Sequence, residues 1–182
     1  MQNPTFDQFS SVLTECRNLF IDKLKDYGAT WRVFRLPSIT DQMYIKAKRI
    51  ISLQNNEVHL IDEGEYPEFI ALVNYSAIAL IQCSKTPTTS IDINFDEAVK
   101  LYDLHIQEAF ELMKKKNHDY GEAWRNMRVS SIADLILVKL LRIKQIEDNN
   151  GNTIVSEGAV GNYHDILNYS VFAMILLNEE KK

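Results

Sequence analysis

Residues 26–35 read DYGATWRVFR, and residues 119–128 read DYGEAWRNMR. The similarity extends beyond these two stretches: between residues 26–54 and 119–147, 12 of 29 aligned positions are identical. One inserted residue then shifts the register, and the match resumes at residues 63–64 against 157–158 and at residues 74–76 against 168–170. An ordered self-similarity of this length, which includes both tryptophans of the chain, indicates a tandem duplication.

Each copy is predicted to form three helices. The first is expected over about residues 6–25 and 95–117, because apolar residues recur there at helical spacing. Gly28 and Gly121 follow these segments and suit the left-handed turn after a helix C-terminus. The third helix is expected from just after residues 63 and 157 to about residues 83 and 178.

The second helix is predicted to begin with a serine N-cap. Ser38 and Ser131 are each followed three residues later by an aspartate, a pattern typical of a helix N-terminus. The helix is expected to end in the polar stretches at residues 54–57 and 148–153. Short β-prone runs follow at residues 58–61 and 153–155, where a brief extended crossing is expected.

We therefore predict an all-α fold. Residues 1–84 form a first helical repeat, residues 85–93 a linker, and residues 94–182 a second repeat. The two three-helix repeats are expected to be related by a pseudo-twofold axis and to pack face to face into one compact helical bundle.

Composition narrows the class of protein. The chain is 46% hydrophobic and 25% charged, which is typical of a globular domain and not of a disordered one. Its net charge of −5 argues against bulk attraction to nucleic acid or to an anionic membrane. No signal segment and no membrane-spanning apolar run is visible, so we expect a cytoplasmic protein without membrane association. Cys16 and Cys83 lie in apolar, helix-like stretches and are expected to be buried, reduced thiols.

Carboxylates gather in the second copy. Glu108 and Glu111 are three residues apart on the first helix, and Glu157 and Asp165 are eight apart on the third, so each pair shares a helix face. Facing helices would then offer four carboxylates to Mg²⁺ or Mn²⁺, which prefer oxygen ligands. The alternative is that these side chains are solvated surface groups. The first copy keeps an acid at two of these positions, Glu15 and Glu63, and has Asn18 and Ala71 at the other two. Glu65 and Glu68 are candidate substitutes there, and a metal site is expected to be intact in the second copy and degenerate in the first.

Four basic positions recur in both copies. Arginine matches phosphate oxygens with its planar guanidinium, and the helix N-terminus near Ser131 adds affinity for anions. These positions predict a pocket for nucleotide phosphates; the alternative is ion pairing with the repeated acids Asp26, Asp41, Asp119 and Asp134. The basic residues are Arg32, Arg35, Lys46 and Arg49 in the first copy and Arg125, Arg128, Lys139 and Arg142 in the second.

Four further residues of the second copy belong to the candidate nucleotide site: Asp119, Tyr120, Trp124 and Asn168. Trp124, like Trp31, either stacks on a base or anchors its loop to the core, and the anchor is the expected role. Asn168 lies in an apolar helix and needs a hydrogen-bond partner if it is buried. No histidine has zinc-like spacing, and no Gly-rich phosphate loop or nucleophile motif is visible.

The second copy resembles a known bacterial and phage domain in three segments: residues 116–124, which read KNHDYGEAW, residues 134–142, and residues 157–169. The domain is known as nucleotide-modification-associated domain 1, and versions with two copies in one chain are similar to this one. The resemblance covers about residues 20–84 and 110–178.

That domain is in turn distantly similar to the all-α MazG-like nucleoside triphosphate pyrophosphatases, helical bundles that hold Mg²⁺ with acids on two helices. The resemblance implies that Glu108 and Glu111 form the first acidic pair and that Glu157 and Asp165 form the second. This second pair is spaced more widely than in those enzymes, and Gly161 stands where a closer acid is expected.

Three functional interpretations stay open. The chain is a Mg²⁺-dependent pyrophosphohydrolase of modified or non-standard nucleoside triphosphates, a nucleotide-binding or regulatory module without catalysis, or a purely structural helical protein. In the first two cases its partner is a small nucleotide. A homodimer is a further expectation, because fused repeats often mimic one and can pair again.

Overall fold

The computed structural model describes residues 4–55, 64–155 and 157–180. These residues form six α-helices and two short 3₁₀ helices, and no strand is present among them. The first repeat contains α1 (Pro4–Tyr27), η1 (Thr30–Val33), α2 (Leu36–Gln54) and α3 (Tyr66–Ser84). The second contains α4 (Phe95–Tyr120), η2 (Ala123–Asn126), α5 (Val129–Asp148) and α6 (Ala159–Glu180). The prediction of an all-α fold with three main helices in each copy is confirmed.

The repeated motif forms the same turn twice. α1 and α4 end just before Gly28 and Gly121, whose φ angles are 65° and 61°. A side chain at this φ is strained, which explains the glycine in both copies. The chain then forms a single 3₁₀ turn that buries Trp31 or Trp124, with 9% and 7% of the side chain exposed. Both tryptophans are buried, as expected of side chains that anchor the turn to the core, and Trp31 also lines a cavity described below.

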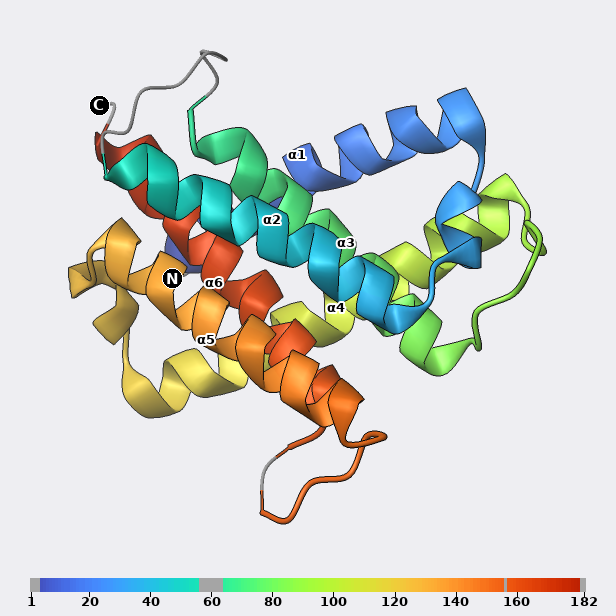
Figure 1. Cartoon of the computed structure of the whole chain (residues 1–182). Helices are drawn as coiled ribbons and strands as arrows, with labels where there is room; N and C mark the ends of the chain where they lie inside the picture. The colour runs from blue at the N-terminus through green and yellow to red at the C-terminus, as the bar shows by residue number, and fades with distance from the viewer. Residues whose placement is uncertain (1–3, 56–63, 156, 181–182) are drawn as a thin grey trace.

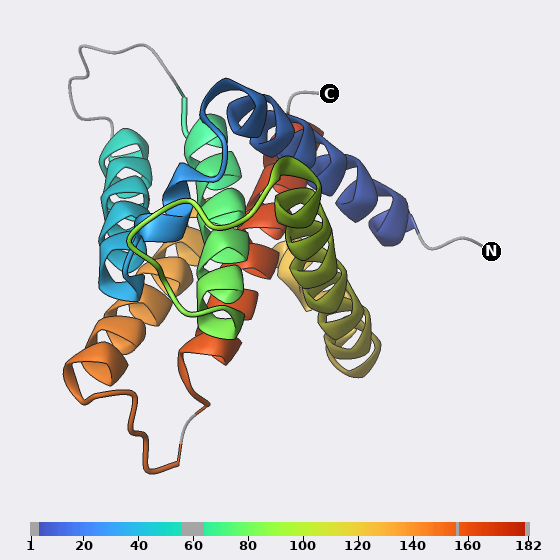
Figure 2. The ribbon, with the colours of Figure 1, turned by 90° about the vertical axis from the view of Figure 1, so that its right-hand side faces the viewer.

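The six helices form three layers, each with one helix from either repeat. α3 packs on α6 in the middle, and both are apolar along most of their length. α2 and α5 pack together on one side of this pair, and α1 and α4 on the other (Figures 1 and 2). α1 contacts both α3 and α6, and α4 does the same. The two repeats therefore share one core, as the pseudo-twofold prediction requires.

The predicted serine caps are wrong. α2 and α5 begin at Leu36 and Val129, and their N-cap residues are Arg35 and Arg128, which form no capping hydrogen bond with their side chains. The predicted serine caps, Ser38 and Ser131, lie inside the first turn. In α2, Pro37 fixes its φ at a helical value and so favours the earlier start. Residues 153–155 form no strand, and the other β-prone run, at 58–61, lies outside the described residues.

Neither cysteine forms a disulfide: Cys16 is buried and Cys83 is half-buried. Burial raises the pKa of the Cys16 thiol to about 12. Within the described part of the chain, no helix combines the length and the apolar character needed to cross a membrane.

Candidate functional site

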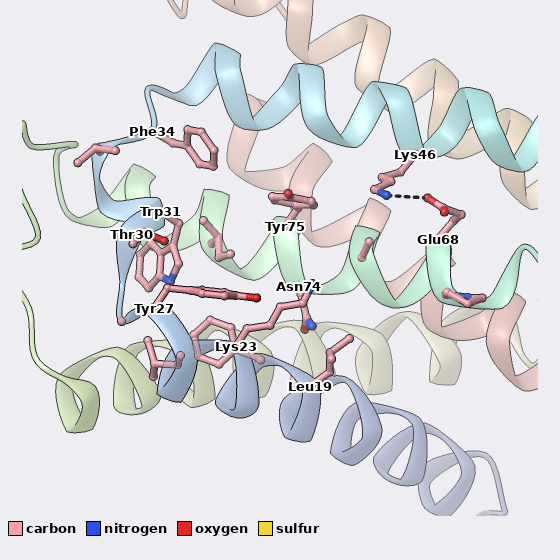
Figure 3. A pocket seen from close by; sticks show the side chains of 17 residues that line it. Leu19, Lys23, Tyr27, Thr30, Trp31, Phe34, Lys46, Glu68, Asn74 and Tyr75 are labelled. Carbon is pink, nitrogen blue, oxygen red and sulfur yellow. Dashed lines mark ion pairs between the residues drawn. The ribbon is translucent and has the colours of Figure 1, made fainter. Parts of the chain in front are cut away.

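A cavity of about 600 Å³ opens in the first repeat, between the C-terminal half of α1, η1, α2 and α3 (Figure 3). The turn at Gly28 brings η1 back over α1, so that the repeated motif itself forms one wall. A volume in this range suits a small organic ligand. The cavity is lined by Leu19, Phe20, Lys23, Leu24, Tyr27, Gly28, Thr30, Trp31, Val33, Phe34, Lys46, Pro67, Glu68, Ala71, Asn74, Tyr75 and Ile78.

One end of the cavity is aromatic. Figure 3 shows Tyr27, Trp31, Phe34 and Tyr75 grouped around it, contributed by α1, η1, the turn before α2, and α3. Trp31 packs against Phe20, with the two ring centroids 6.3 Å apart. Aromatic walls of this kind favour a planar, apolar ligand group.

The other end is charged. The carboxylate of Glu68 is 4% exposed and pairs with Lys46 Nζ at 3.1 Å and with Arg49 Nε at 3.3 Å. Neither Glu68 Oε2 nor Arg49 Nε has a hydrogen bond of good geometry, so this buried network is incompletely satisfied. Lys23 lines the cavity from α1, next to Tyr27 and Asn74 in Figure 3, and the described residues give it no ion pair. The cavity therefore has two lysines and one carboxylate in its lining, with Arg49 beside that carboxylate, although the whole chain is acidic.

Asn74 lies between the two ends. Its Nδ2 donates to the Cys16 carbonyl at 3.1 Å, and its Oδ1 accepts from the Tyr102 hydroxyl at 2.7 Å. Both polar groups of Asn74 are therefore used to hold α1, α3 and α4 together.

Arg32, the most deeply buried basic residue of the motif, stabilises the fold. It is 0% exposed and donates to Asp92 at 2.8 Å, to the carbonyls of Lys85 and Thr86, and to Gln82. These bonds tie η1 to the end of α3 and to the linker. Its acidic partner is Asp92, which is not one of the four repeated acids.

In the second repeat the predicted metal-binding carboxylates mostly face cations. Asp165 accepts from Lys116 Nζ at 2.6 Å and from Lys139 Nζ at 2.7 Å. Burial alone would raise the pKa of Asp165, but the two lysines outweigh it and hold that pKa below its usual value. The charged form of Lys116 is stabilised as well: burial alone would lower the pKa of Lys116, but Asp165, Tyr169 and Glu157 outweigh it and raise that pKa.

The other three carboxylates are exposed. Glu108 bonds His105 Nδ1 at 2.8 Å, and Glu111 pairs with Lys114 at 2.9 Å. Glu157 lies against Gly161, where an added Cβ would displace the Glu157 carboxylate. The described residues contain no group of three or more His, Cys, Asp or Glu arranged to hold a metal ion. The four-carboxylate Mg²⁺ or Mn²⁺ site stays a prediction.

The predicted phosphate-binding residues are dispersed in the second repeat. Arg125 pairs with Glu122 and Glu179 and donates to Thr5 and Gln8, so it joins η2 to both ends of the chain. Arg128 and Arg142 are exposed, and no ion pair to the described residues involves them. Only Lys139 faces a buried partner, Asp165.

The remaining residues of the predicted nucleotide site have local or structural contacts. Asp119 pairs only with its neighbour His118 among the described residues, and Tyr120 is 77% exposed. Trp124 stacks on Phe172, with centroids 4.3 Å apart and planes 8° apart. Asn168 donates to the Ala109 carbonyl at 3.1 Å, as Asn74 does to Cys16.

Sequence reasoning concentrated on the second repeat and missed the cavity of the first. Lys23 and Tyr75 were not singled out, although each has a counterpart of the same type in the second copy, Lys116 and Tyr169. Glu68 was a candidate substitute for the lost acid, and it does pair with Lys46. The sequence does contain one signal for the cavity: some positions have a smaller residue in the first repeat than in the second, such as Ala71 against Asp165.

Comparison with known proteins agrees with the duplication. A family model described as nucleotide modification associated domain 1 matches the chain twice, at residues 23–83 and 116–177. No match was found among curated proteins or among solved structures. Each matched segment lies within one structural repeat, from the end of its first helix to its third, and the two together cover more than half of the chain, so the protein belongs to the nucleotide modification associated domain 1 family, in a tandem form.

Proposed function

We propose that the first repeat binds a nucleotide in the cavity between α1, η1, α2 and α3. The carrying observation is that one cavity combines aromatic side chains, Trp31 and Tyr75, with two lysines, Lys23 and Lys46. A nucleotide has the matching polarity, a planar base at one end and an anionic phosphate at the other. The family description, which associates the domain with nucleotide modification, supports the same ligand class.

The base is assigned to the aromatic end. Base–aromatic stacking contributes about 1–3 kcal/mol and tolerates every base, because each has a π-face. The phosphate is assigned to the lysines, whose ammonium groups act as point charges on phosphate oxygens. The cavity volume of about 600 Å³ accommodates a mononucleotide.

Tryptophan fluorescence tests this proposal directly. The chain has two tryptophans, so Trp124→Phe leaves Trp31 as the only reporter. We expect nucleotides to change the emission of this variant with saturation, and Lys23→Ala and Lys46→Ala each to weaken binding about tenfold, the loss of one charge-assisted contact.

Lys25→Ala is the matched control, because Lys25 lies on the same helix as Lys23 but pairs with Asp22 and does not line the cavity. Its affinity should equal that of the parent. If no nucleotide changes the Trp31 signal and none shifts the melting temperature, the proposed binding function is wrong.

Hydrolysis of a nucleoside triphosphate to its monophosphate and pyrophosphate is a second, finer proposal. It rests on the resemblance to the pyrophosphatases and on four acids of the second repeat, of which Glu157 and Asp165 both act on Lys116. Glu108, Glu111, Glu157 and Asp165 would hold the Mg²⁺ or Mn²⁺ that such chemistry requires. Pyrophosphate release that depends on Mg²⁺ and is lost in Glu157→Gln would support it, whereas identical background release in both proteins would leave binding without catalysis.

A further inference from the structure

The two repeats use one pair of lysines differently. Lys23 and Lys46 of the first repeat correspond to Lys116 and Lys139 of the second. In the second repeat the Asp165 carboxylate lies between its two lysines, at 2.6 and 2.7 Å from them. In the first repeat Ala71 stands at the position of Asp165, and the cavity occupies the space beside it.

Glu68 compensates only part of this change. It lies one turn before Ala71 on α3 and pairs with Lys46 and Arg49, whereas Lys23 has no ion pair among the described residues. An anion placed where Asp165 lies in the second repeat would therefore meet uncompensated positive charge. Lys46 is half-buried and Lys23 is exposed, so the contact of such an anion with Lys46 is stronger than an ion pair at a fully solvated surface.

The residues packed against the two tryptophans also differ between the repeats. Phe172 stacks on Trp124 in the second repeat, with ring centroids 4.3 Å apart. Ile78 is the equivalent residue in the first repeat, and its smaller side chain lines the cavity beside Trp31. The second repeat thus supplies from its own α6 both an aromatic ring on the tryptophan and a carboxylate between the lysines.

We propose that Phe172 and Asp165 are internal counterparts of the two halves of the ligand that the first repeat binds. The ligand has a planar aromatic ring that packs against Trp31 and a compact anionic group that lies between Lys23 and Lys46. This inference rests on the proposed nucleotide function and narrows it to a nucleoside monophosphate, bound once per chain, with the second site closed by Phe172 and Asp165.

Exchange of the two residues between the repeats tests the inference. Calorimetric titration with a panel of nucleoside monophosphates, with inorganic phosphate as a reference, should give one site per wild-type chain. Ala71→Asp should weaken binding at least tenfold, because its carboxylate takes the place of the anion. The same variant should melt at a higher temperature without ligand, since it neutralises two lysines. Loss of binding with a gain in stability would show that the new carboxylate takes the place of the ligand's anionic group, whereas loss of binding with a loss of stability would indicate damage to the fold.

Ala71→Asn is the matched control, because it adds the same volume without the charge. It should reduce affinity less than Ala71→Asp and should not raise the melting temperature. Asp165→Ala combined with Phe172→Ile, the residues found at these positions in the first repeat, should open a second site, visible as an increase in stoichiometry from one towards two.

The outcomes distinguish the two levels of the proposal. If the wild-type chain binds no monophosphate, this inference is wrong, and the proposed function falls with it only if the tryptophan titration also shows no binding of any nucleotide. If the wild type binds but Ala71→Asp keeps its affinity within about twofold, or melts at a lower temperature, nucleotide binding stands and the internal-counterpart inference is wrong. Equal effects of Ala71→Asp and Ala71→Asn would also overturn it.

Discussion

Replacement of Tyr102 by phenylalanine removes one hydroxyl group from the interior of the bundle. Tyr102 is 0% exposed, and its hydroxyl donates to Asn74 Oδ1 at 2.7 Å. The variant leaves a buried carbonyl oxygen without its donor, which costs about 1–3 kcal/mol. With a urea m-value of about 2 kcal/mol per molar, the unfolding midpoint should fall by about 1 M.

The symmetry-related position on α1 offers the reciprocal experiment. Phe9 occupies the position equivalent to Tyr102, and the oxygen of Asn168, the counterpart of Asn74, is buried without a hydrogen-bond partner. Phe9 lies beside α6, with its ring 5.8 Å from that of Phe172, one turn from Asn168. Phe9→Tyr should therefore place a donor near Asn168 and raise stability by up to about 1 kcal/mol.

Urea unfolding of wild type and both variants measures these effects. The reasoning predicts opposite signs, with Tyr102→Phe destabilising and Phe9→Tyr stabilising. It is refuted if Tyr102→Phe unfolds within about 0.3 kcal/mol of wild type, because the hydroxyl would then contribute nothing. A loss in Phe9→Tyr larger than that in Tyr102→Phe would mean that the two repeats do not pack equivalently at this position.

Three other predictions follow from single sites. The contacts with Lys116 and Lys139 hold the pKa of Asp165 below its unfolded value, so ionised Asp165 stabilises the fold at pH above the unfolded pKa, and this contribution is lost as the pH falls through the folded pKa. Urea unfolding at pH 7 and pH 3 should therefore show that wild type loses more stability on acidification than Asp165→Asn does. Equal losses in the two proteins would contradict this prediction. Gly28→Ala should cost about 1–2 kcal/mol because φ is 65°, while Gly158→Ala, where no positive φ is required, should be near neutral by the same assay. Burial raises the thiol pKa of Cys16 to about 12 and of Cys83 to about 11, so a thiol reagent at pH 8 should label the folded chain far more slowly than the unfolded one, and rapid stoichiometric labelling of the native protein would show that the thiols are accessible.

The fold was predictable because the duplication is visible in the sequence. The spacing of the motif fixes where each first helix ends, and the glycine after it requires a positive φ in both copies. Helix starts were less predictable: the serine-to-aspartate pattern at residues 38–41 and 131–134 is a common cap, but the extended backbone at Arg35 and Arg128 precedes it. Local patterns identify the helices, and packing of the preceding turn decides their first residue.

The site was less predictable than the fold. The sequence comparison favoured the second repeat because it keeps more acids, yet the cavity lies in the first. Which carboxylate reaches which lysine depends on the positions of three helices, and Glu68 and Asp165 approach equivalent lysines from different turns. Ala71 is smaller than its counterpart Asp165 and so leaves space for a ligand. A search for charged residues that recur in both copies does not detect a position at which such a residue is absent.

A crystal structure of the chain with a bound nucleoside monophosphate and Mg²⁺ is the most direct test of the central claim that the first repeat holds the ligand site. The account predicts electron density in the cavity between α1 and α3, with the ring against Trp31 and the phosphate between Lys23 and Lys46. Density instead among Glu108, Glu111, Glu157 and Asp165, with the first-repeat cavity free of ligand, would contradict it.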